Sequence, residues 1–293
     1  MSQRVLVAGG TGYLGGYALE VFKKRGHFVR ALVRSPKKLD ARKAFVDEVV
    51  AGEVTEPETL KGCCDGIDIV FSSVGITKQV GKLTFKDVDF QGNVNLLEEA
   101  KRAGAKTFVY VSVYNARNLL HLDIVKAHED FVDVLRESGM DYRVIRPTGY
   151  YSDMGEFLKM AQGGRVFLFG DGTNRINPIH GEDLAEFCVR SIDGAEKEVD
   201  VGGPKTYTTR EIGALALQTL GKPVKISSLP MSVARFMVWL LRLINHHKGE
   251  VLAFITTMAS TDVVCPVAFG LHALGDHFKA ISGPTPKQLP EAT

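Results

Sequence analysis

The sequence predicts an α/β fold built on a doubly wound parallel sheet, with a smaller C-terminal lobe. Over residues 1–150, short runs rich in β-branched residues alternate with longer segments in which apolar residues recur every three to four positions. Such alternation is typical of β-α-β units, which build a parallel sheet with helices on both faces. After Pro147 the pattern changes to a stretch rich in glycine and turn residues, where the lobe is expected to begin.

Each expected strand is short, and the longer helices are followed by glycines that favour helix termination, Gly104 and Gly139. Pro57 is expected to open a short helix. In the second half, Thr208 and Glu211 have the spacing of a helix-capping box. The expected strands lie at 4–8, 28–33, 46–50, 67–74, 107–111, 142–145 and 198–201, and the expected helices at 85–103, 123–138 and 182–192.

The length and composition indicate a well-packed protein that needs no disulfides or metals to stabilise it. The chain has 293 residues, of which 45% are apolar and 24% charged. A chain of this length buries roughly 75% of its unfolded surface. We expect an α/β domain at 1–150, a smaller C-terminal lobe at 151–282 that is partly interleaved with the sheet, and a flexible tail at 283–293.

Charge and cysteine content exclude several classes of protein. Lysine and arginine number 36 and aspartate and glutamate 34, so a net charge of +2 gives no general case for nucleic-acid binding. The cysteines form no C-x-x-C pair, and adjacent cysteines cannot form an ordinary bridge, so a structural zinc site or a disulfide framework is not expected. The N-terminus does not fit a signal peptide, and a cytoplasmic location is expected. The cysteines are Cys63, Cys64, Cys188 and Cys265.

A glycine-rich loop follows the first expected strand and opens the first helix. A tight turn without side chains lets the backbone approach a pyrophosphate, and the following helix offers free N–H groups and the positive end of its dipole. The alternative is a glycine-rich turn without a ligand. The strand-loop-helix context favours a dinucleotide, and the loop comprises Gly9, Gly10, Thr11, Gly12, Tyr13, Leu14 and Gly15.

Arg34 ends the second expected strand, where NAD-binding proteins usually carry an acid that binds the ribose 2′-hydroxyl. A guanidinium instead binds a 2′-phosphate through paired, charge-assisted hydrogen bonds. These are worth about 1.5–3 kcal/mol each, which favours NADP(H) by tens to hundreds of fold. The alternative is a solvated basic loop, a description that also fits Lys37 and Lys38.

Several motifs carry a resemblance to a known family over most of the chain. They are VLVAGGTGYLGG at the start, ALVR at 31–34, VDFQGNVNLLEEAKRAG at 88–104, FVYVSV at 108–113, YRVIRPTGYYSDM at 142–154 and FGDGTNRINPIHGEDLAEF at 169–187. On these motifs the chain resembles the atypical and extended short-chain dehydrogenase/reductase superfamily. Within it, the chain most resembles the NmrA-like and isoflavone-reductase-like branches, and it also resembles the divinyl chlorophyllide 8-vinyl reductases.

The resemblance implies a Rossmann-type NADP domain and further cofactor contacts. It implies that Glu53 and Val54 touch adenine, with Glu53 in place of the usual aspartate. It also implies a serine, Ser112, near the nicotinamide. The remaining implied contacts are Ser72, Ser73, Val74 and Gly75 beside the ribose and pyrophosphate, and Pro147, Thr148 and Gly149 beside the carboxamide.

The chain departs from the superfamily's Tyr-x-x-x-Lys active-site motif. Lys126 matches the lysine, whereas the tyrosine position is Leu122. The resemblance implies that Lys126 binds the nicotinamide ribose, and without the tyrosine it either keeps only that role or becomes the proton donor. A free lysine titrates near 10.4, so proton exchange near neutrality requires burial or a cationic neighbour.

A reduction requires a proton for the product as well as a hydride from the cofactor. Candidate donors besides Lys126 are Tyr114, which follows the expected strand that ends at Val111, and Tyr150 and Tyr151. The two adjacent tyrosines either line the substrate site or pack against the lobe. His180 is expected to support the start of the helix at 182–192, with Asp183 capping that region, while His121, His246 and His247 have no assigned role.

Residues 231–244 are apolar on nearly all sides apart from Arg235 and Arg242. Such a helix is normally buried, so we expect it to pack within the lobe or to form an apolar wall of the substrate site. The alternatives are a contact between subunits and a membrane-surface helix. The segment is too short to span a bilayer, which needs about 20 apolar residues.

Two hypotheses of function follow. In the first, the chain is an NADPH-dependent reductase that transfers hydride to a sizeable apolar or conjugated carbonyl or alkene, a small-molecule substrate. In the second, it binds NADP(H) without turnover, as a redox sensor or as a subunit of an assembly, like some NmrA-like proteins. The missing tyrosine motivates the second hypothesis, and the sequence gives no indication of the oligomeric state.

Overall fold

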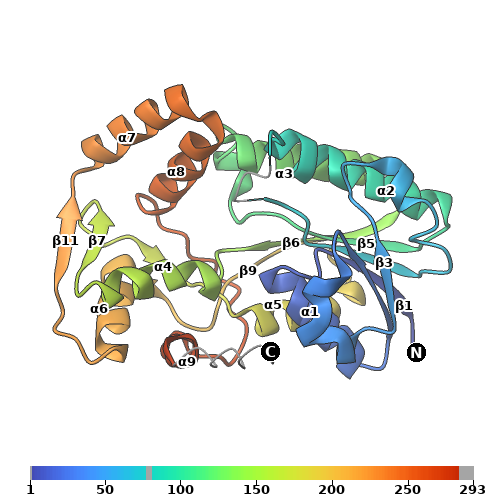
Figure 1. Cartoon of the computed structure of the whole chain (residues 1–293), viewed down its shortest axis with the longest axis horizontal. Coiled ribbons are helices and arrows are strands. Elements are labelled where there is room, and N and C mark those ends of the chain that lie inside the picture. The colour runs from blue at the N-terminus through green and yellow to red at the C-terminus, as the bar shows by residue number, and fades with distance from the viewer. Residues whose placement is uncertain (1, 77–80, 284–293) are drawn as a thin grey trace, which may run out of the picture.

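The computed structural model describes residues 2–76 and 81–283, and within these residues seven parallel strands form the main sheet in the order β3-β2-β1-β4-β5-β6-β9 (Figure 1). The chain runs outward from β1 to β3 and then returns beside β1 as β4, so the order reverses between β1 and β4. The strands are β1 (Arg4–Ala8), β2 (Phe28–Val33), β3 (Glu48–Ala51), β4 (Ile69–Ser72), β5 (Thr107–Val111), β6 (Asp141–Pro147) and β9 (Glu198–Val201).

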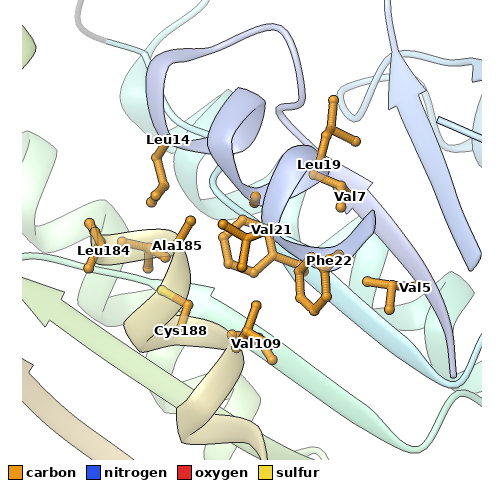
Figure 2. Packing of buried hydrophobic residues seen from close by; sticks show 14 of the residues in the cluster. Val5, Val7, Leu14, Leu19, Val21, Phe22, Val109, Leu184, Ala185 and Cys188 are labelled. Carbon is orange, nitrogen blue, oxygen red and sulfur yellow. The ribbon is translucent and has the colours of Figure 1, made fainter. Parts of the chain in front are cut away.

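Helices cover both faces of this sheet because alternate strand residues point to opposite sides. Val5 and Val7 of β1 pack under α1 (Tyr13–Lys24) and α5 (Gly181–Ile192), as Figure 2 shows. Leu6 and Ala8 face α2 (Asn93–Arg102) and α3 (Asp123–Glu137). The predicted doubly wound α/β fold is therefore confirmed.

The boundaries of individual elements differ modestly from those expected. β3 and β4 are each four residues long, and β6 extends to Pro147, whereas β9 occupies the expected residues. Short 3₁₀ helices lie at Pro36–Phe45, Pro57–Leu60 and Ala116–Asn118. The helix expected at 85–103 begins as a π-helix, Lys86–Gly92, before α2.

Buried polar contacts to the end of β4 accompany this wider helical turn. Asp89 is fully buried and its carboxylate accepts a hydrogen bond from the backbone N–H of Ile76 at 3.3 Å. The Asn93 amide donates to the carbonyls of Asp89 and Val74, at 2.7 and 3.3 Å. The π-helical turn is thus hydrogen-bonded to the edge of the sheet where a ligand of a doubly wound fold would bind.

The C-terminal lobe has its own apolar core, formed mainly by α4 (Tyr151–Gln162), α6 (Thr209–Thr219) and α9 (Leu274–Ser282). The predicted capping box is confirmed, because Thr208 and Glu211 exchange hydrogen bonds at the start of α6. Two small sheets complete the lobe: β7 (Val166–Phe169) pairs with β11 (Ile226–Leu229), and β8 (Arg175–Ile176) with β10 (Tyr207–Thr208).

The expectation that residues 231–244 are buried is wrong. These residues form α7 (Met231–Ile244), which packs chiefly on α8 (His246–Met258). Only Ala234 and Val238 are fully buried, whereas Phe236 and Trp239 are exposed. The physical reason is that one neighbouring helix covers only a narrow stripe of α7. Residues 284–293, which include nearly all of the expected tail, lie outside the described residues.

No helix among the described residues has the length and apolar character needed to cross a bilayer.

Candidate functional site

The glycine loop lies at the carboxyl end of β1 and requires its glycines. Gly9 has a φ of +85°, and the N–H of Gly12 donates to the Gly9 carbonyl at 2.8 Å, which closes the turn. A Cβ on Gly9 would lie 2.8 Å from the Ser73 Oγ, and a Cβ on Gly15 would overlap the Gly9 carbonyl oxygen. The loop therefore packs directly against the start of α1 and the end of β4.

The start of α1 is open to an anion. Gly12 is its N-cap, no side chain caps this end, and the first turn contains no acidic residue. The first N–H groups of a helix have no intrahelical partner, and they lie at the positive end of the dipole. A close backbone cradle with uncapped N–H groups fits the pyrophosphate of a dinucleotide, as the sequence predicts.

The side chains of the loop mostly point away from this cradle. Thr11 is exposed, whereas Leu14 lies in the core shared by α1 and α5. The Tyr13 hydroxyl accepts a hydrogen bond from the N–H of Gly181 at 3.1 Å, so the loop is attached to the start of α5. Burial raises the pKa of Tyr13 above its usual value, which keeps the phenol neutral.

Arg34 and Glu53 lie side by side at the ends of β2 and β3. The Arg34 Nε is 3.7 Å from a Glu53 carboxylate oxygen, and the arginine side chain is exposed. Val54 is buried beside Gly92, at the junction with α2. The contact between Arg34 and Glu53 is long for a hydrogen bond, so the guanidinium retains donors for a phosphate.

The segment after β4 approaches the glycine loop through Ser73. The Ser73 Oγ donates to the Ala8 carbonyl at 3.4 Å, and Val74 is half-buried beside it. The Ser72 hydroxyl is fully buried and donates to Asn93 at 2.6 Å, so its side chain is engaged within the protein. A Cβ on Gly75 would lie 2.9 Å from the Asp89 carboxylate, so this glycine allows a close backbone approach.

The three predicted catalytic residues have separate hydrogen-bond partners. The buried Ser112 hydroxyl donates to Glu129 at 2.6 Å, and the Tyr114 hydroxyl donates to the Val264 carbonyl at 3.0 Å. The Lys126 Nζ pairs with both oxygens of Asp130, at 2.6 and 2.7 Å, and its side chain is 58% exposed. No contact among the described residues joins Ser112, Tyr114 and Lys126 directly.

Leu122 occupies the position of the missing tyrosine and is buried. It belongs to an apolar cluster that includes Phe85, Val238 of α7 and Ala253 of α8. A tyrosine here would place its hydroxyl in apolar surroundings unless that hydroxyl found a partner. The α7–α8 pair thus explains why a leucine fits at this point of α3.

Lys126 lines a cavity of about 560 Å³ between the start of the π-helix, α3 and the start of α8. His246 and His247 belong to the same wall, and His246 Nε2 lies 2.8 Å from the Asp123 carboxylate. The His247 ring is buried and stacks on Phe85 at 4.3 Å, and neither of its ring nitrogens has a hydrogen-bond partner among the described residues. A buried imidazole without partners is costly, so this wall favours a polar ligand group.

Sequence reasoning assigned no role to these histidines, and no local signal could have placed them here. They lie about 120 positions from Lys126, and only the packing of α8 on α3 brings them beside it.

The end of β6 lies against the C-terminal lobe. The Thr148 hydroxyl donates to the Asn177 carbonyl at 2.6 Å, and the Pro147 carbonyl accepts from the N–H of Tyr114 at 3.1 Å. Gly149 is followed by Tyr150, which is the N-cap of α4. The ring centre of Tyr150 lies 6.0 Å from that of Tyr13. The segment that the resemblance places beside the nicotinamide, 147–149, therefore contacts Tyr114 through a backbone hydrogen bond and is followed directly by Tyr150.

The two adjacent tyrosines have different surroundings. Tyr150 is half-buried beside the glycine loop, and burial raises its pKa. Tyr151 is buried in the core of the lobe, and its hydroxyl donates to the His272 carbonyl at 2.8 Å. The packing interpretation therefore describes Tyr151, while Tyr150 keeps a position from which it could line a substrate site.

His180 forms the N-cap of α5, which is the supporting role expected from the sequence. Its Nδ1 accepts a hydrogen bond from the N–H of Glu182 at 3.3 Å, and its ring stacks on His272 at 4.0 Å. Asp183 does not cap α5 and instead binds the segment before α9, accepting hydrogen bonds from the backbone N–H groups of Leu271 and His272.

Burial, together with the neighbouring His272 and His277, lowers the pKa of His180 to about 4. The unfolded state, with a pKa near 6.5, therefore binds a proton first as the pH falls, and stability decreases between about pH 6.5 and pH 4. We expect the free energy of unfolding to fall by about 2 kcal/mol between pH 7 and pH 5 because of His180. Urea unfolding of the wild type and of His180→Asn, which keeps a capping side chain, measures the difference.

The comparison between the two proteins isolates the histidine from other groups. Burial raises the pKa of Asp153 to about 6, which has the opposite effect on stability over part of this range, but it is present in both proteins. Parallel pH dependences for the two proteins would contradict the assignment.

A family model described as NAD(P)H-binding matches residues 9–195, which include the glycine loop, β2 to β6, and α5. The chain belongs to this NAD(P)H-binding family, and the nucleotide-binding domain recognised in the sequence is confirmed.

Two relatives are similar to the chain over most of its length. The chain is 30% identical over 264 residues to the Photosystem II assembly factor Ycf39 of Synechocystis sp., covering 88% of this chain and 80% of that protein. It is 30% identical over 258 residues to the chloroplastic divinyl chlorophyllide a 8-vinyl-reductase of Zea mays, covering 81% of this chain and 64% of that protein.

Solved structures share the fold at lower identity. The NADPH-dependent quinone oxidoreductase QOR2 of Escherichia coli, complexed with NADPH, superposes with a TM-score of 0.74 at 20% identity, covering 95% of this chain and 99% of that one. The triphenylmethane reductase of Citrobacter sp. gives a TM-score of 0.74 at 17% identity, covering 96% and 99%.

Proposed function

We propose that the chain is an NADPH-dependent reductase that transfers hydride to an apolar or conjugated carbonyl or alkene. The observation that carries the proposal is the uncapped start of α1 at the end of β1, beside the exposed Arg34 at the end of β2. The similarity to a protein named as a vinyl reductase supports the reaction class. The cytoplasm as compartment and a small molecule as partner are parts of the same proposal.

In this mechanism the protein positions the reactants and handles the proton, while bound NADPH supplies the hydride. The N–H groups at the start of α1 hold the pyrophosphate, and Arg34 binds the 2′-phosphate. Lys126, held by Asp130, binds the nicotinamide ribose or gives the product its proton. The cavity lined by Lys126 and His247 accommodates the polar end of the substrate.

The proposal predicts that Arg34 selects the cofactor. Arg34→Ala is expected to weaken NADPH binding by about 10- to 100-fold, because it removes one or two charge-assisted hydrogen bonds to the 2′-phosphate. NADH affinity should change little, and Lys38→Ala, an exposed lysine on the same loop, is the matched control. Isothermal titration calorimetry measures all three proteins. Equal losses for both cofactors, or no NADP(H) binding by the wild type, would refute the proposal.

A second candidate function is NADP(H) binding without turnover, as in a redox sensor or an assembly subunit. Its specific support is the buried Leu122 where the superfamily has its tyrosine, together with the 30% identity to a protein named as an assembly factor. In this case Lys126 would hold the cofactor and no substrate would be reduced.

NADPH consumption with enones, quinones and vinyl tetrapyrroles separates the two candidates. If the chain is a reductase, Lys126→Ala should lower kcat by about 100-fold while leaving most of the NADPH affinity, because a lysine that orients the nicotinamide ribose aligns the reacting atoms. The exposure of Lys126 and its ion pair with Asp130 do not supply the burial or the cationic neighbour that a lysine proton donor requires. Glu137→Ala, near the C-terminal end of the same helix, is the control. Tight NADPH binding without consumption of any acceptor would favour the sensor.

A further inference from the structure

The exposed face of α7 is an apolar feature that the cofactor site does not explain. Trp239, Leu243 and Ile244 are 57%, 68% and 73% exposed. Figure 1 shows α7 at the outer edge of the molecule, next to α8 and on the side of the lobe away from α9. The other exposed apolar side chains of this helix are Val233, Phe236, Met237 and Leu240.

These side chains form one continuous surface. At 3.6 residues per turn, the exposed apolar positions span about 160° of the helix circumference. The buried residues Ala234 and Val238 lie on the opposite side, where α7 contacts α8. Contiguous apolar surface of this kind on a folded protein indicates a contact with another apolar phase.

The charges on α7 favour an anionic neighbour. The helix contains no acidic residue, and Arg235 and Arg242 lie together along one edge of the apolar face. Arg242 pairs with Glu250 at 2.7 Å, whereas Arg235 has no ion-pair partner within the described ranges 2–76 and 81–283. An arginine at the border of an apolar face lies where lipid headgroups meet acyl chains.

The exposed face of α7 has few hydrogen-bonding groups, which favours a lipid surface over a protein as its partner. Protein interfaces contain about one hydrogen bond per 100–200 Å². From Phe236 to Leu241 every side chain of α7 is apolar, and among them only the indole N–H of Trp239 can donate. The boundary between headgroups and acyl chains requires no hydrogen bonds from this face, and it is the depth at which tryptophan side chains accumulate.

We propose that α7 is a membrane-surface helix that inserts its apolar face into the interface between headgroups and acyl chains of an anionic lipid membrane. With 14 residues it is too short to span a bilayer but suited to lie in the interfacial plane, with Arg235 facing the anionic headgroups. The membrane then covers the face that the lobe leaves uncovered. The proposal does not depend on cofactor binding, because α7 lies outside the glycine loop and the Arg34 loop.

Trp239 is the only tryptophan in the sequence, so its fluorescence reports directly on this face. Vesicles of phosphatidylcholine, with and without phosphatidylglycerol, are mixed with the full-length protein. We expect co-sedimentation with the anionic vesicles, a shift of Trp239 emission to shorter wavelength, and quenching by lipids brominated on their acyl chains.

Single variants test the two components of binding. Leu243→Asp should weaken vesicle binding by about tenfold or more, because it removes buried apolar surface and adds a charge of the wrong sign. Arg235→Ala should weaken binding by about fivefold, and only to the anionic vesicles. Val224→Asp, an exposed apolar position in the loop before β11, is the matched control and should bind like the wild type. Circular dichroism of each variant checks the fold.

Two results would overturn the proposal. The first is absence of sedimentation and of any Trp239 emission shift with anionic vesicles. The second is a wild type that forms a concentration-dependent dimer which Leu243→Asp dissociates, with no vesicle binding, because a second copy of the chain would then cover α7.

Discussion

Replacing Gly15 by alanine is expected to weaken NADPH binding by about 100-fold. A Cβ at this position overlaps the carbonyl of Gly9, which is rigid backbone rather than the end of a flexible side chain. Either the loop or the start of α1 must therefore move, and the N–H groups that face the pyrophosphate lose their alignment. Losing two charge-assisted hydrogen bonds of about 1.5 kcal/mol each accounts for the factor.

The control for this variant is Gly155→Ala, in the middle of α4. A Cβ there would make only an ordinary contact, 3.7 Å from Ile281, and alanine favours helix over glycine. We expect Gly155→Ala to bind NADPH like the wild type and to be no less stable. NADPH titration by fluorescence, with thermal unfolding of each protein, checks both statements. Unchanged affinity in a folded Gly15→Ala protein would contradict the role assigned to the loop.

Local signals in the sequence were sufficient to predict the sheet and the turn of the glycine loop. The turn at Gly9 depends on neighbours within a few residues, and Arg34 needs only to follow β2 to lie near the glycine loop, because parallel strands end at the same edge. The capping box at Thr208 was predictable for the same reason.

Features that depend on distant packing were not predictable. Periodicity shows how apolar a helix is but not what covers it, so α7 was expected to be buried although it packs chiefly on one helix, α8. The π-helical turn involves Asp89 and its contact with the end of β4, which no periodic pattern records. His247 reaches the cavity of Lys126 only because α8 returns to α3.

Ser112 illustrates both cases. The resemblance implied where Ser112 lies, directly after β5 and near the nicotinamide. Its hydrogen bond to Glu129 was not indicated by the sequence, and it connects Ser112 to a buried network of charged side chains. Arg146 of β6 pairs with Glu129 through two hydrogen bonds, at 3.1 and 2.8 Å, and with Glu198 of β9 at 2.9 Å. The hydrogen bonds from Arg136 outweigh burial and, with those from Arg146, lower the pKa of Glu198 to about 2.

Arg146→Met is therefore expected to cost about 3–5 kcal/mol of unfolding free energy at pH 7, because it leaves the buried Glu129 carboxylate without its charge partner. Arg190→Met, which removes an exposed arginine that pairs with Glu186 on α5, is the control and should cost less than about 1 kcal/mol. Urea unfolding monitored by circular dichroism measures both. Similar losses of unfolding free energy for the two variants would show that the buried pair stabilises the protein no more than an exposed one.

A double variant separates an unpaired charge from lost packing. Arg146→Met combined with Glu129→Leu should be more stable than Arg146→Met alone, because the charge that lacked a partner is removed with it. Arg136 still pairs with Glu198 in this protein, so that carboxylate stays compensated. If the double variant is less stable than either single variant, the network stabilises this part of the sheet mainly through packing.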